Sequence, residues 1–240
     1  MFSIKSLFIS ILYLLSSTAF AGQVRIAVVD TGLNLKDNRF TNILCKDGSK
    51  DLTGEGFRDY VGHGTHVAGL IRRQLIGLES KYCLVIIKYY KVNSIDDNKE
   101  LFQQAIQYAA SINLDFVNVS AEGPGYSLRE YTAIKITPET KWVIAAGNGG
   151  KDLDVSCDVY PVCYNLPNII GVGNLERDLT HSDTSNYGTK VTAWEMGIKV
   201  TSDFIPHDLC KYHCDKRMSG TSMSTAIHTG KLVKELINGR

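Results

Sequence analysis

Short apolar segments alternate along this chain with segments of helical periodicity. Five nearly continuous apolar runs predict strands, at residues 24–29, 83–90, 116–119, 142–146 and 169–172. The segments 66–75, 100–110, 127–135 and 221–237 predict helices. Continuous apolar strands between helices are typical of a parallel sheet that is covered on both faces. We therefore expect an α/β fold with three layers, in which helices flank a mainly parallel central sheet.

Three polar residues stand at the ends of predicted strands. Asp30 ends the first apolar run, Ser120 follows residues 116–119, and Asn148 comes shortly after residues 142–146. In parallel sheets, functional sites gather at the carboxyl ends of the strands. We expect these three side chains to project near one edge of the sheet.

Two further polar residues, His63 and Ser222, are expected at the starts of helices. Gly62 and Gly64 flank His63, and Gly220 comes shortly before Ser222, so the backbone can turn tightly at both places. A serine at a helix N-terminus lies at the positive end of the helix dipole, which favours negative charge on a nearby oxygen.

Taken singly, each of these residues has an ordinary structural explanation. Asp30 fits a turn before Gly32, and Ser222 fits a helix cap. His63 fits a structural histidine or, together with His66, a metal-binding pair. Asp, His and Ser together make a nucleophile that none of them makes alone, so their joint presence favours a catalytic triad.

The N-terminal residues 1–21 have the pattern of a signal peptide. Lys5 precedes an apolar run from Leu7 to Leu15, and residues 19–21 fit a cleavage site between small side chains. The run is shorter than the ~20 residues that span a membrane, and an uncleaved anchor is the alternative. We expect a single domain over residues 22–240, secreted or periplasmic, without stable membrane anchoring after cleavage.

The charge of the chain is balanced. With 26 basic and 25 acidic residues the net charge is +1, and the sequence has neither a basic stripe nor a block of like charges. This argues against nucleic acid as a partner and against a disordered charged tail. The oligomeric state is not readable from these features.

All six cysteines lie after residue 21, and an even number in an exported chain favours disulfides. Six cysteines allow 15 pairings. Close spacing suggests Cys157 with Cys163 and Cys210 with Cys214, which leaves Cys45 for Cys83. The alternative is a zinc site formed by the nearby residues His207, Cys210, His213 and Cys214.

The three polar segments resemble the signature motifs of the subtilisin-like serine proteases. Asp-Thr-Gly at residues 30–32, His-Gly-Thr-His-Val-Ala-Gly at 63–69 and Gly-Thr-Ser-Met at 220–223 match in sequence and in order. Ala-Ala-Gly-Asn at 145–148 resembles the segment that carries the oxyanion asparagine of this family. Asn-Val-Ser at 118–120 resembles the strand that binds the substrate backbone. The resemblance extends from residue 24 to about residue 230.

The resemblance implies a mechanism for cleaving peptide bonds. Ser222 would attack the peptide carbonyl, His63 would accept and return the proton, and Asp30 would orient His63. The Asn148 amide and the Ser222 backbone N–H would hold the oxyanion, although a turn residue is the alternative for Asn148. Substrate would add as an extended strand beside Ser120, Ala121 and Glu122.

The sequence departs from the pattern of this family in four places. Ala226 stands where a proline is expected after the serine, and we expect the helix to survive because alanine favours helices. We expect no separate pro-domain, because Asp30 comes only eight residues after Gly22. The short segment between Gly69 and Cys83 lacks the calcium-binding loop of many relatives, so calcium is possible but unsupported and no other cofactor is implied. The chain ends about 18 residues after Ser222, which indicates a minimal version of the fold.

Two acidic residues bear on the substrate. Glu122 and Asp158 fall in segments that resemble pocket walls, where they would favour Lys or Arg in a peptide or protein substrate. The alternative is that both point into solvent. Two other functions also stay open: a catalytically silent relative that binds peptides or proteins, and a peptide ligase or processing enzyme for one dedicated precursor.

Overall fold

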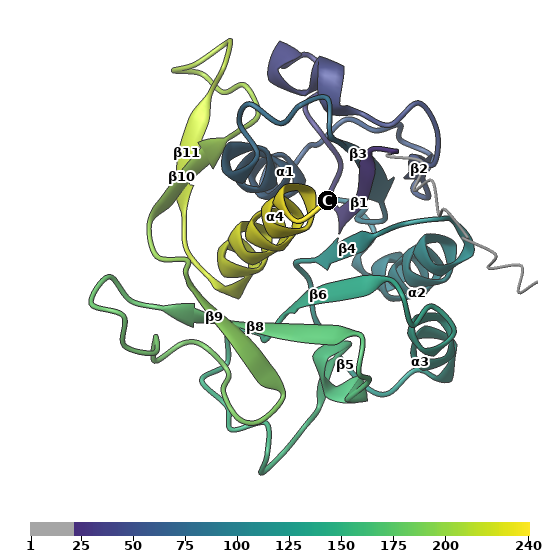
Figure 1. Cartoon of the computed structure of the whole chain (residues 1–240), viewed down its shortest axis with the longest axis vertical. Coiled ribbons are helices and arrows are strands. Elements are labelled where there is room, and N and C mark those ends of the chain that lie inside the picture. Colours follow the sequence, from purple (N-terminus) through teal and green to yellow (C-terminus); the bar gives the residue numbers. More distant parts are fainter. Residues whose placement is uncertain (1–21) are drawn as a thin grey trace, which may run out of the picture.

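The computed structural model describes residues 22–240, and the expected signal peptide at residues 1–21 lies outside the described residues. The centre of the fold is a seven-stranded sheet in which every neighbouring pair of strands is parallel (Figure 1). In spatial order the strands are β2 (Lys50–Asp51), β3 (Tyr82–Lys88), β1 (Val24–Asp30), β4 (Phe116–Val119), β6 (Lys141–Ala145), β8 (Ile169–Leu175) and β9 (Val191–Met196).

Helices cover both faces of this sheet. In Figure 1, α1 (His63–Gln74) and α4 (Thr221–Asn238) lie on one face, and α2 (Ile95–Ser111) and α3 (Leu128–Lys135) lie on the other. Two apolar cores separate the three layers. The expected three-layer α/β fold is confirmed.

Alternation along β1 supplies both cores. Ile26 and Val28 belong to the core beneath α1 and α4, whereas Ala27 and Val29 belong to the core beneath α2 and α3. Successive side chains of a strand point to opposite faces, so a strand buried on both faces has no polar positions. This is why β1 is apolar without interruption from Ile26 to Val29, up to Asp30, at which the strand ends.

Smaller elements lie around the sheet. Two hydrogen-bonded pairs of antiparallel strands, β10 (Val200–Asp203) with β11 (Asp215–Met218) and β5 (Gly123–Pro124) with β7 (Val159–Tyr160), stand apart from it. Two short 3₁₀ helices span Asn38–Ile43 and Val162–Tyr164. None of these elements was expected from the sequence, and neither were β2 and β9.

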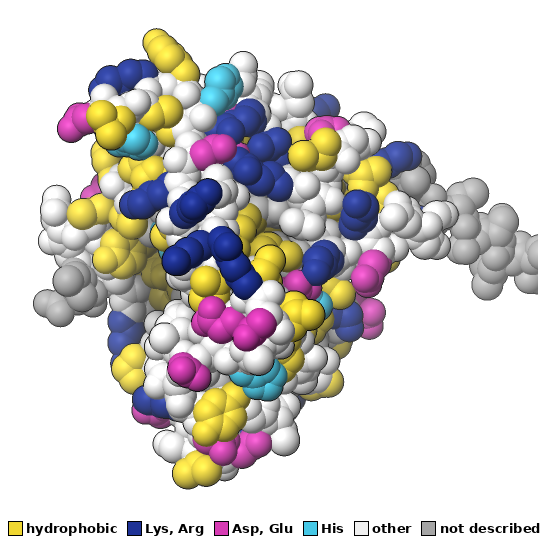
Figure 2. All heavy atoms as spheres, turned by 90° about the vertical axis from the view of Figure 1, so that its left-hand side faces the viewer, with side chains coloured by type: hydrophobic (Ala, Val, Ile, Leu, Met, Phe, Trp, Pro, Cys, Tyr) yellow, Lys and Arg dark blue, Asp and Glu magenta, His cyan; other side chains and the backbone are white. Residues whose placement is uncertain are grey.

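The β10–β11 pair is attached to the helix that carries His63. Asp203 is fully buried and pairs with Arg72 of α1 at 2.9 Å and with Arg73 at 2.7 Å. Arg39 adds a third ion pair to the same carboxylate at 2.9 Å. Figure 2 shows this side of the molecule, where Lys and Arg side chains gather next to acidic ones. A buried carboxylate needs such partners, so the network fixes the hairpin against α1.

The last helix tolerates the missing proline. The α4 helix is continuous from Thr221 to Asn238, and Ala226 is fully buried in the core that it shares with α1. The expectation that alanine preserves this helix is therefore confirmed. No helix within residues 22–240 is long and apolar enough to cross a membrane.

All six cysteines are paired as their spacing suggested. The disulfides are Cys45–Cys83, Cys157–Cys163 and Cys210–Cys214. The first joins residues 38 positions apart and ties the segment before β2 to β3, whereas the third closes a separation of only four.

Removing the Cys45–Cys83 disulfide is expected to cost more stability than removing either of the others. In the chain-entropy description, a 38-residue separation corresponds to about 4 kcal/mol of unfolding free energy and a four-residue one to about 2 kcal/mol. Urea unfolding of the Cys45→Ala/Cys83→Ala double variant measures the loss. The Cys210→Ala/Cys214→Ala variant is the matched control, and equal losses would contradict the prediction.

Candidate active site

Two neighbouring strands bring Asp30 and Ser120 to the same edge of the sheet. Val29 of β1 is in register with Val119 of β4, so the next residues, Asp30 and Ser120, lie side by side. Both side chains are nearly buried, at 3% and 4% exposure. The expectation that polar residues after parallel strands converge is confirmed for this pair.

Asp30 is hydrogen-bonded to the imidazole of His63. The Nδ1 atom of His63 lies 2.8 Å from Oδ1 and 3.0 Å from Oδ2 of the carboxylate. Asp30 Oδ1 also accepts a hydrogen bond from the Thr31 backbone N–H at 2.7 Å, which fixes the carboxylate. The carboxylate of Asp30 can accept a hydrogen bond from a proton on Nδ1, and this tautomer leaves Nε2 of the neutral ring as a base.

The charge of Asp30 governs the protonation of His63. Burial lowers the pKa of the imidazole, but the Asp30 charge and hydrogen bond, with a further contribution from the Asp59 charge, outweigh it. The result is a pKa above its ordinary value, so the protonated ring is stabilised in the site. This is the property that a base needs if it is to hold a proton during a reaction.

A second carboxylate, that of Asp59, organises the start of α1. Asp59 Oδ1 accepts hydrogen bonds from the backbone N–H groups of Val61 and Gly62 and from the Thr31 hydroxyl. Asp59 Oδ2 accepts from both the backbone N–H and the hydroxyl of Thr65. A carboxylate at a helix N-terminus satisfies N–H groups that have no partner in the helix. Asp59 therefore positions the turn that carries His63.

The glycines beside His63 are required by the backbone. Gly62 has a φ of 91°, in the left-handed region that favours glycine. A Cβ atom on Gly64 would overlap the carbonyl oxygen of Gly32, so the helix start packs directly on the turn after Asp30. The predicted helix 66–75 in fact begins at His63, because Asp59 caps it earlier than the apolar periodicity indicates.

Ser222 is the second residue of α4 and lies against Ser120. Its hydroxyl donates a hydrogen bond to the Ser120 carbonyl oxygen at 3.1 Å, and the Ser120 hydroxyl donates to the Ser222 carbonyl at 3.0 Å. The helices α1 and α4, whose first turns carry His63 and Ser222, pack against each other. Ser222 thus lies at the same edge of the sheet as Asp30 and His63.

Asn148 follows β6 and is held by the residue before Ser222. Its Oδ1 atom accepts hydrogen bonds from the backbone N–H of Thr221 at 2.9 Å and from the Thr221 hydroxyl at 3.2 Å. Because Oδ1 is fixed in this way, the Nδ2 donor is oriented away from Thr221. The Ser222 N–H lies in the first turn of α4, where backbone donors have no partner within the helix.

The segment Ser120–Glu122 leads from β4 toward β5. Glu122 lies beside Asn148, since its Oε1 accepts a hydrogen bond from the Asn148 backbone N–H at 3.3 Å. Loss of part of its hydration raises the pKa of the Glu122 carboxyl group, although the Asn148 hydrogen bond and the nearby Lys151 charge act in the opposite direction. Asp158, the other acidic residue noted in the sequence, is exposed and pairs with Lys151 at 3.3 Å.

The residues considered for metal binding have other partners. His66 is fully buried and lies 3.0 Å through Nε2 from the Lys216 carbonyl oxygen, while His63 faces Asp30. His207, Cys210 and Cys214 come together, but the two cysteines form a disulfide, and zinc binds thiolates. Nδ1 of His213 lies 3.2 Å from Asp37.

Sequence reasoning missed Asp59 and Thr221. Both act through hydrogen bonds to backbone or amide groups of the residues that the motifs did indicate. The position of Asp59, four residues before His63 and just ahead of a helix, was the available signal, since acidic residues are favoured at helix starts.

Comparison with known proteins shows which family this chain belongs to. The sequence model of the subtilase family matches residues 22–235. The chain is 32% identical over 229 residues to an intracellular serine protease of Paenibacillus polymyxa, covering 90% of this chain and 68% of that protein. It is 30% identical to subtilisin-like protease 2 of Pseudogymnoascus destructans, covering 94% of this chain and 54% of that protein.

Solved structures share the fold. A cold-adapted subtilisin-like serine proteinase matches with a TM-score of 0.72 at 24% identity, over 92% of this chain and 78% of the other. A lanthipeptide protease matches with a TM-score of 0.73 at 18% identity, over 89% and 73%. The three-layer arrangement is thus that of subtilisin-like proteases. The chain belongs to the subtilase family and is a subtilisin-like serine endopeptidase, a hydrolase that acts on peptides or proteins.

Proposed function

We propose that this chain is an exported endopeptidase that cleaves peptide bonds through an Asp30–His63–Ser222 triad and an acyl-enzyme. The observation that carries the proposal is the buried Asp30 carboxylate 2.8 Å from Nδ1 of His63. This pair leaves Nε2 of His63 as the base at the edge of the sheet where Ser222 lies. Burial and hydrogen bonding of the carboxylate are what keep the ring in that orientation.

The reaction begins when a peptide adds beside residues 120–122. In the free protein the Ser222 hydroxyl donates to the Ser120 carbonyl. A peptide N–H that binds this carbonyl would take the place of the hydroxyl, which then turns toward His63. Ser222 Oγ attacks the peptide carbonyl carbon while its proton passes to Nε2 of His63. His63 returns the proton to the leaving amine, and water attacks the acyl-enzyme with the same base.

Negative charge forms on the carbonyl oxygen during both attacks. The Asn148 Nδ2 group and the Ser222 backbone N–H are the donors that would hold it. The Asn148 side chain is already oriented through its bonds to Thr221, so little reorganisation is needed when the charge develops.

Replacing Asn148 with alanine is expected to lower kcat by about 10²–10³-fold, the range known for the equivalent loss in subtilisin. KM should change little, because the donor acts on charge that is present only in the transition state. Steady-state kinetics on a quenched peptide measures both constants. Asn113→Ala, which alters an exposed asparagine ahead of β4, is the control. A change confined to KM would contradict the oxyanion role.

Export is supported by the sequence of residues 1–21 and by the cysteines. All six cysteines are paired, and disulfides persist in oxidising compartments such as the periplasm or the extracellular space. Intact mass of the protein recovered from the periplasm or medium should correspond to a chain that begins at Gly22. A product that retains residues 1–21, or one found only in the cytosol, would contradict export.

The triad is tested by fluorophosphonate labelling of the protein without residues 1–21. A single adduct, absent from Ser222→Ala, is expected because the reagent reacts with an activated serine. Folded, disulfide-intact protein that takes no label would contradict the proposal and would favour a silent peptide-binding protein.

A further inference from the structure

A hollow of about 300 Å³ is lined by Gly149, the residue after Asn148, and by Glu122, which accepts the Asn148 N–H. Its lining also includes Lys151, Asp158 and Asn186. This volume is at the low end of ligand pockets, which span roughly 300–1,000 Å³, so it fits one side chain of a peptide better than a whole ligand. In a bound peptide, the residue whose carbonyl oxygen is held by Asn148 would have its side chain nearest to this hollow.

The wall of this hollow is fixed by pairing and by a disulfide. Gly123 and Pro124 of β5 pair with Tyr160 and Val159 of β7, and Cys157–Cys163 closes the loop around β7. Glu122 therefore precedes a short strand that is anchored on both sides, and its position is set by the fold.

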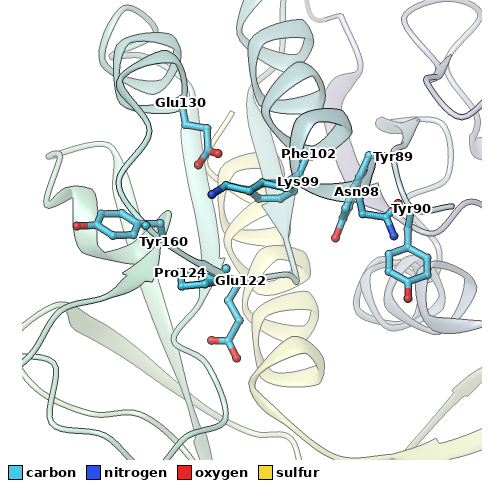
Figure 3. Close-up of a pocket in the computed structure, with 11 residues that line it drawn as sticks. Tyr89, Tyr90, Asn98, Lys99, Phe102, Glu122, Pro124, Glu130 and Tyr160 are labelled. Carbon is cyan, nitrogen blue, oxygen red and sulfur yellow. The ribbon is translucent and has the colours of Figure 1, made fainter. Parts of the chain in front are cut away.

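The Glu122 carboxylate turns toward the oxyanion residues. In Figure 3 the Glu122 carboxylate points away from Lys99 and Phe102, which line the neighbouring cavity. Its Oε1 accepts the Asn148 N–H at 3.3 Å, and a Cβ atom on Gly147 would overlap its Oε2. Glycine at position 147 thus leaves room for this carboxylate directly beside the site of bond cleavage.

The other charged groups of the hollow neutralise each other. Lys151 pairs with Asp158 at 3.3 Å. The neutral side chain of Asn186 already has hydrogen-bond partners, since its Oδ1 accepts hydrogen bonds from the backbone N–H groups of Gly149 and Lys151. Within residues 22–240, Glu122 forms no ion pair, so one negative charge faces the hollow without a partner.

We propose that Glu122 selects substrates with a Lys or Arg side chain on the residue whose carbonyl group is attacked. This inference rests on the proposed function of Ser222 and Asn148. A long cationic side chain in the hollow would bring its charge to the carboxylate, while its aliphatic part lies along the walls. Bound peptide would exclude water from this pair and strengthen the attraction.

The protonation behaviour of Glu122 agrees with this role. The site removes part of the hydration of the carboxylate and raises its pKa above the ordinary value. The ionised form is therefore incompletely stabilised in the free protein. A cation in the hollow would supply the missing stabilisation, whereas an apolar side chain of equal length would not.

Cleavage of two quenched peptides that differ only at this residue, Lys or norleucine, tests the proposal. Norleucine keeps the aliphatic chain and lacks the ammonium group. Wild-type kcat/KM is expected to be about 10- to 100-fold higher for Lys, the range of a hydrogen bond to a charged group. In Glu122→Gln the ratio of the two values should fall toward one. Using the ratio cancels any general loss of activity from the contact with Asn148.

The Lys151→Gln/Asp158→Asn double variant is the control, because it removes an ion pair from the same hollow without changing the net charge there. It should preserve most of the preference for Lys. Competitive inhibition of the wild-type protein by benzamidine, compared with uncharged benzamide, gives a second measurement that does not depend on a variant folding.

The outcomes separate the two proposals. Protein that takes the fluorophosphonate label and cleaves Lys and norleucine peptides equally, or that is inhibited equally by benzamidine and benzamide, overturns the role of Glu122 alone. A ratio that persists in Glu122→Gln and falls in Lys151→Gln/Asp158→Asn does the same. Protein that takes no label and cleaves neither peptide overturns the proposed triad.

Discussion

Replacing Ser222 with alanine is expected to lower kcat by about 10⁶-fold, the magnitude found for the corresponding serine in subtilisin. The substitution removes the oxygen that forms the acyl-enzyme, while the oxyanion donors and the peptide-binding segment stay in place. The measurement is steady-state hydrolysis of a quenched peptide at high protein concentration. Stability should change little, because the hydroxyl contributes one hydrogen bond, to Ser120.

Ser80→Ala is a matched control for this experiment. Ser80 is exposed and precedes β3, so it lies at the opposite edge of the sheet from the candidate triad. It should keep wild-type kcat. If Ser222→Ala retains more than about a thousandth of the activity, another group is the nucleophile, since the oxyanion hole and binding alone leave only ~10³–10⁴-fold over water.

Asp30→Asn is expected to lower kcat by about 10⁴-fold without unfolding the site. The asparagine amide can donate to Nδ1 of His63, which stabilises the tautomer whose proton is on Nε2 and removes the base. Asparagine has nearly the same shape as aspartate. The fall in kcat therefore measures the contribution of the Asp30 charge and of its carboxylate oxygens as hydrogen-bond acceptors.

The same variant should move the pH profile of kcat/KM. In the wild type, activity needs neutral His63, and Asp30 raises the pKa of the ring, so the acid limb lies above the ordinary imidazole range. Without the Asp30 charge, burial dominates and the pKa falls, so the limb of the residual activity moves to lower pH. If the acid limb of the kcat/KM profile stays at the same pH in Asp30→Asn, that limb is not caused by the protonation of His63. Asp178→Asn, which alters an exposed carboxylate in the segment after β8, is the control and should leave the limb in place.

The fold could be predicted where strands are buried on both faces. The sequences of β1, β3, β4, β6 and β8 are nearly free of polar residues because both sides of each strand face a core. β9 lies at the edge of the sheet and is only partly buried, so Thr192 and Glu195 interrupt its apolar pattern. The polar β10–β11 pair depends on the Asp203 ion pairs, which no local pattern encodes.

The residues of the candidate site that stand next to glycines in short motifs could be predicted from the sequence. Asp30, His63 and Ser222 stand in short segments whose glycines mark tight turns and helix starts. Asp59 has no glycine directly beside it, and its place four residues before His63 indicates only a helix cap, whereas its hydrogen bonds to the backbone N–H groups of the turn are seen only in the folded chain. The direction of the Glu122 side chain depends likewise on the space left by Gly147, 25 positions away.

The order of the strands in space has a consequence for when the protein can act. β1 is the first strand in the chain but lies between β3 and β4, and Ser222 contacts a residue 102 positions earlier. Such distant contacts form late, because each closes a long loop. A chain that is still emerging from the ribosome therefore contains Asp30 and His63 before Ser222 has been made. Under the proposed mechanism, peptide cleavage begins only after α4 has been synthesised and has packed against the sheet.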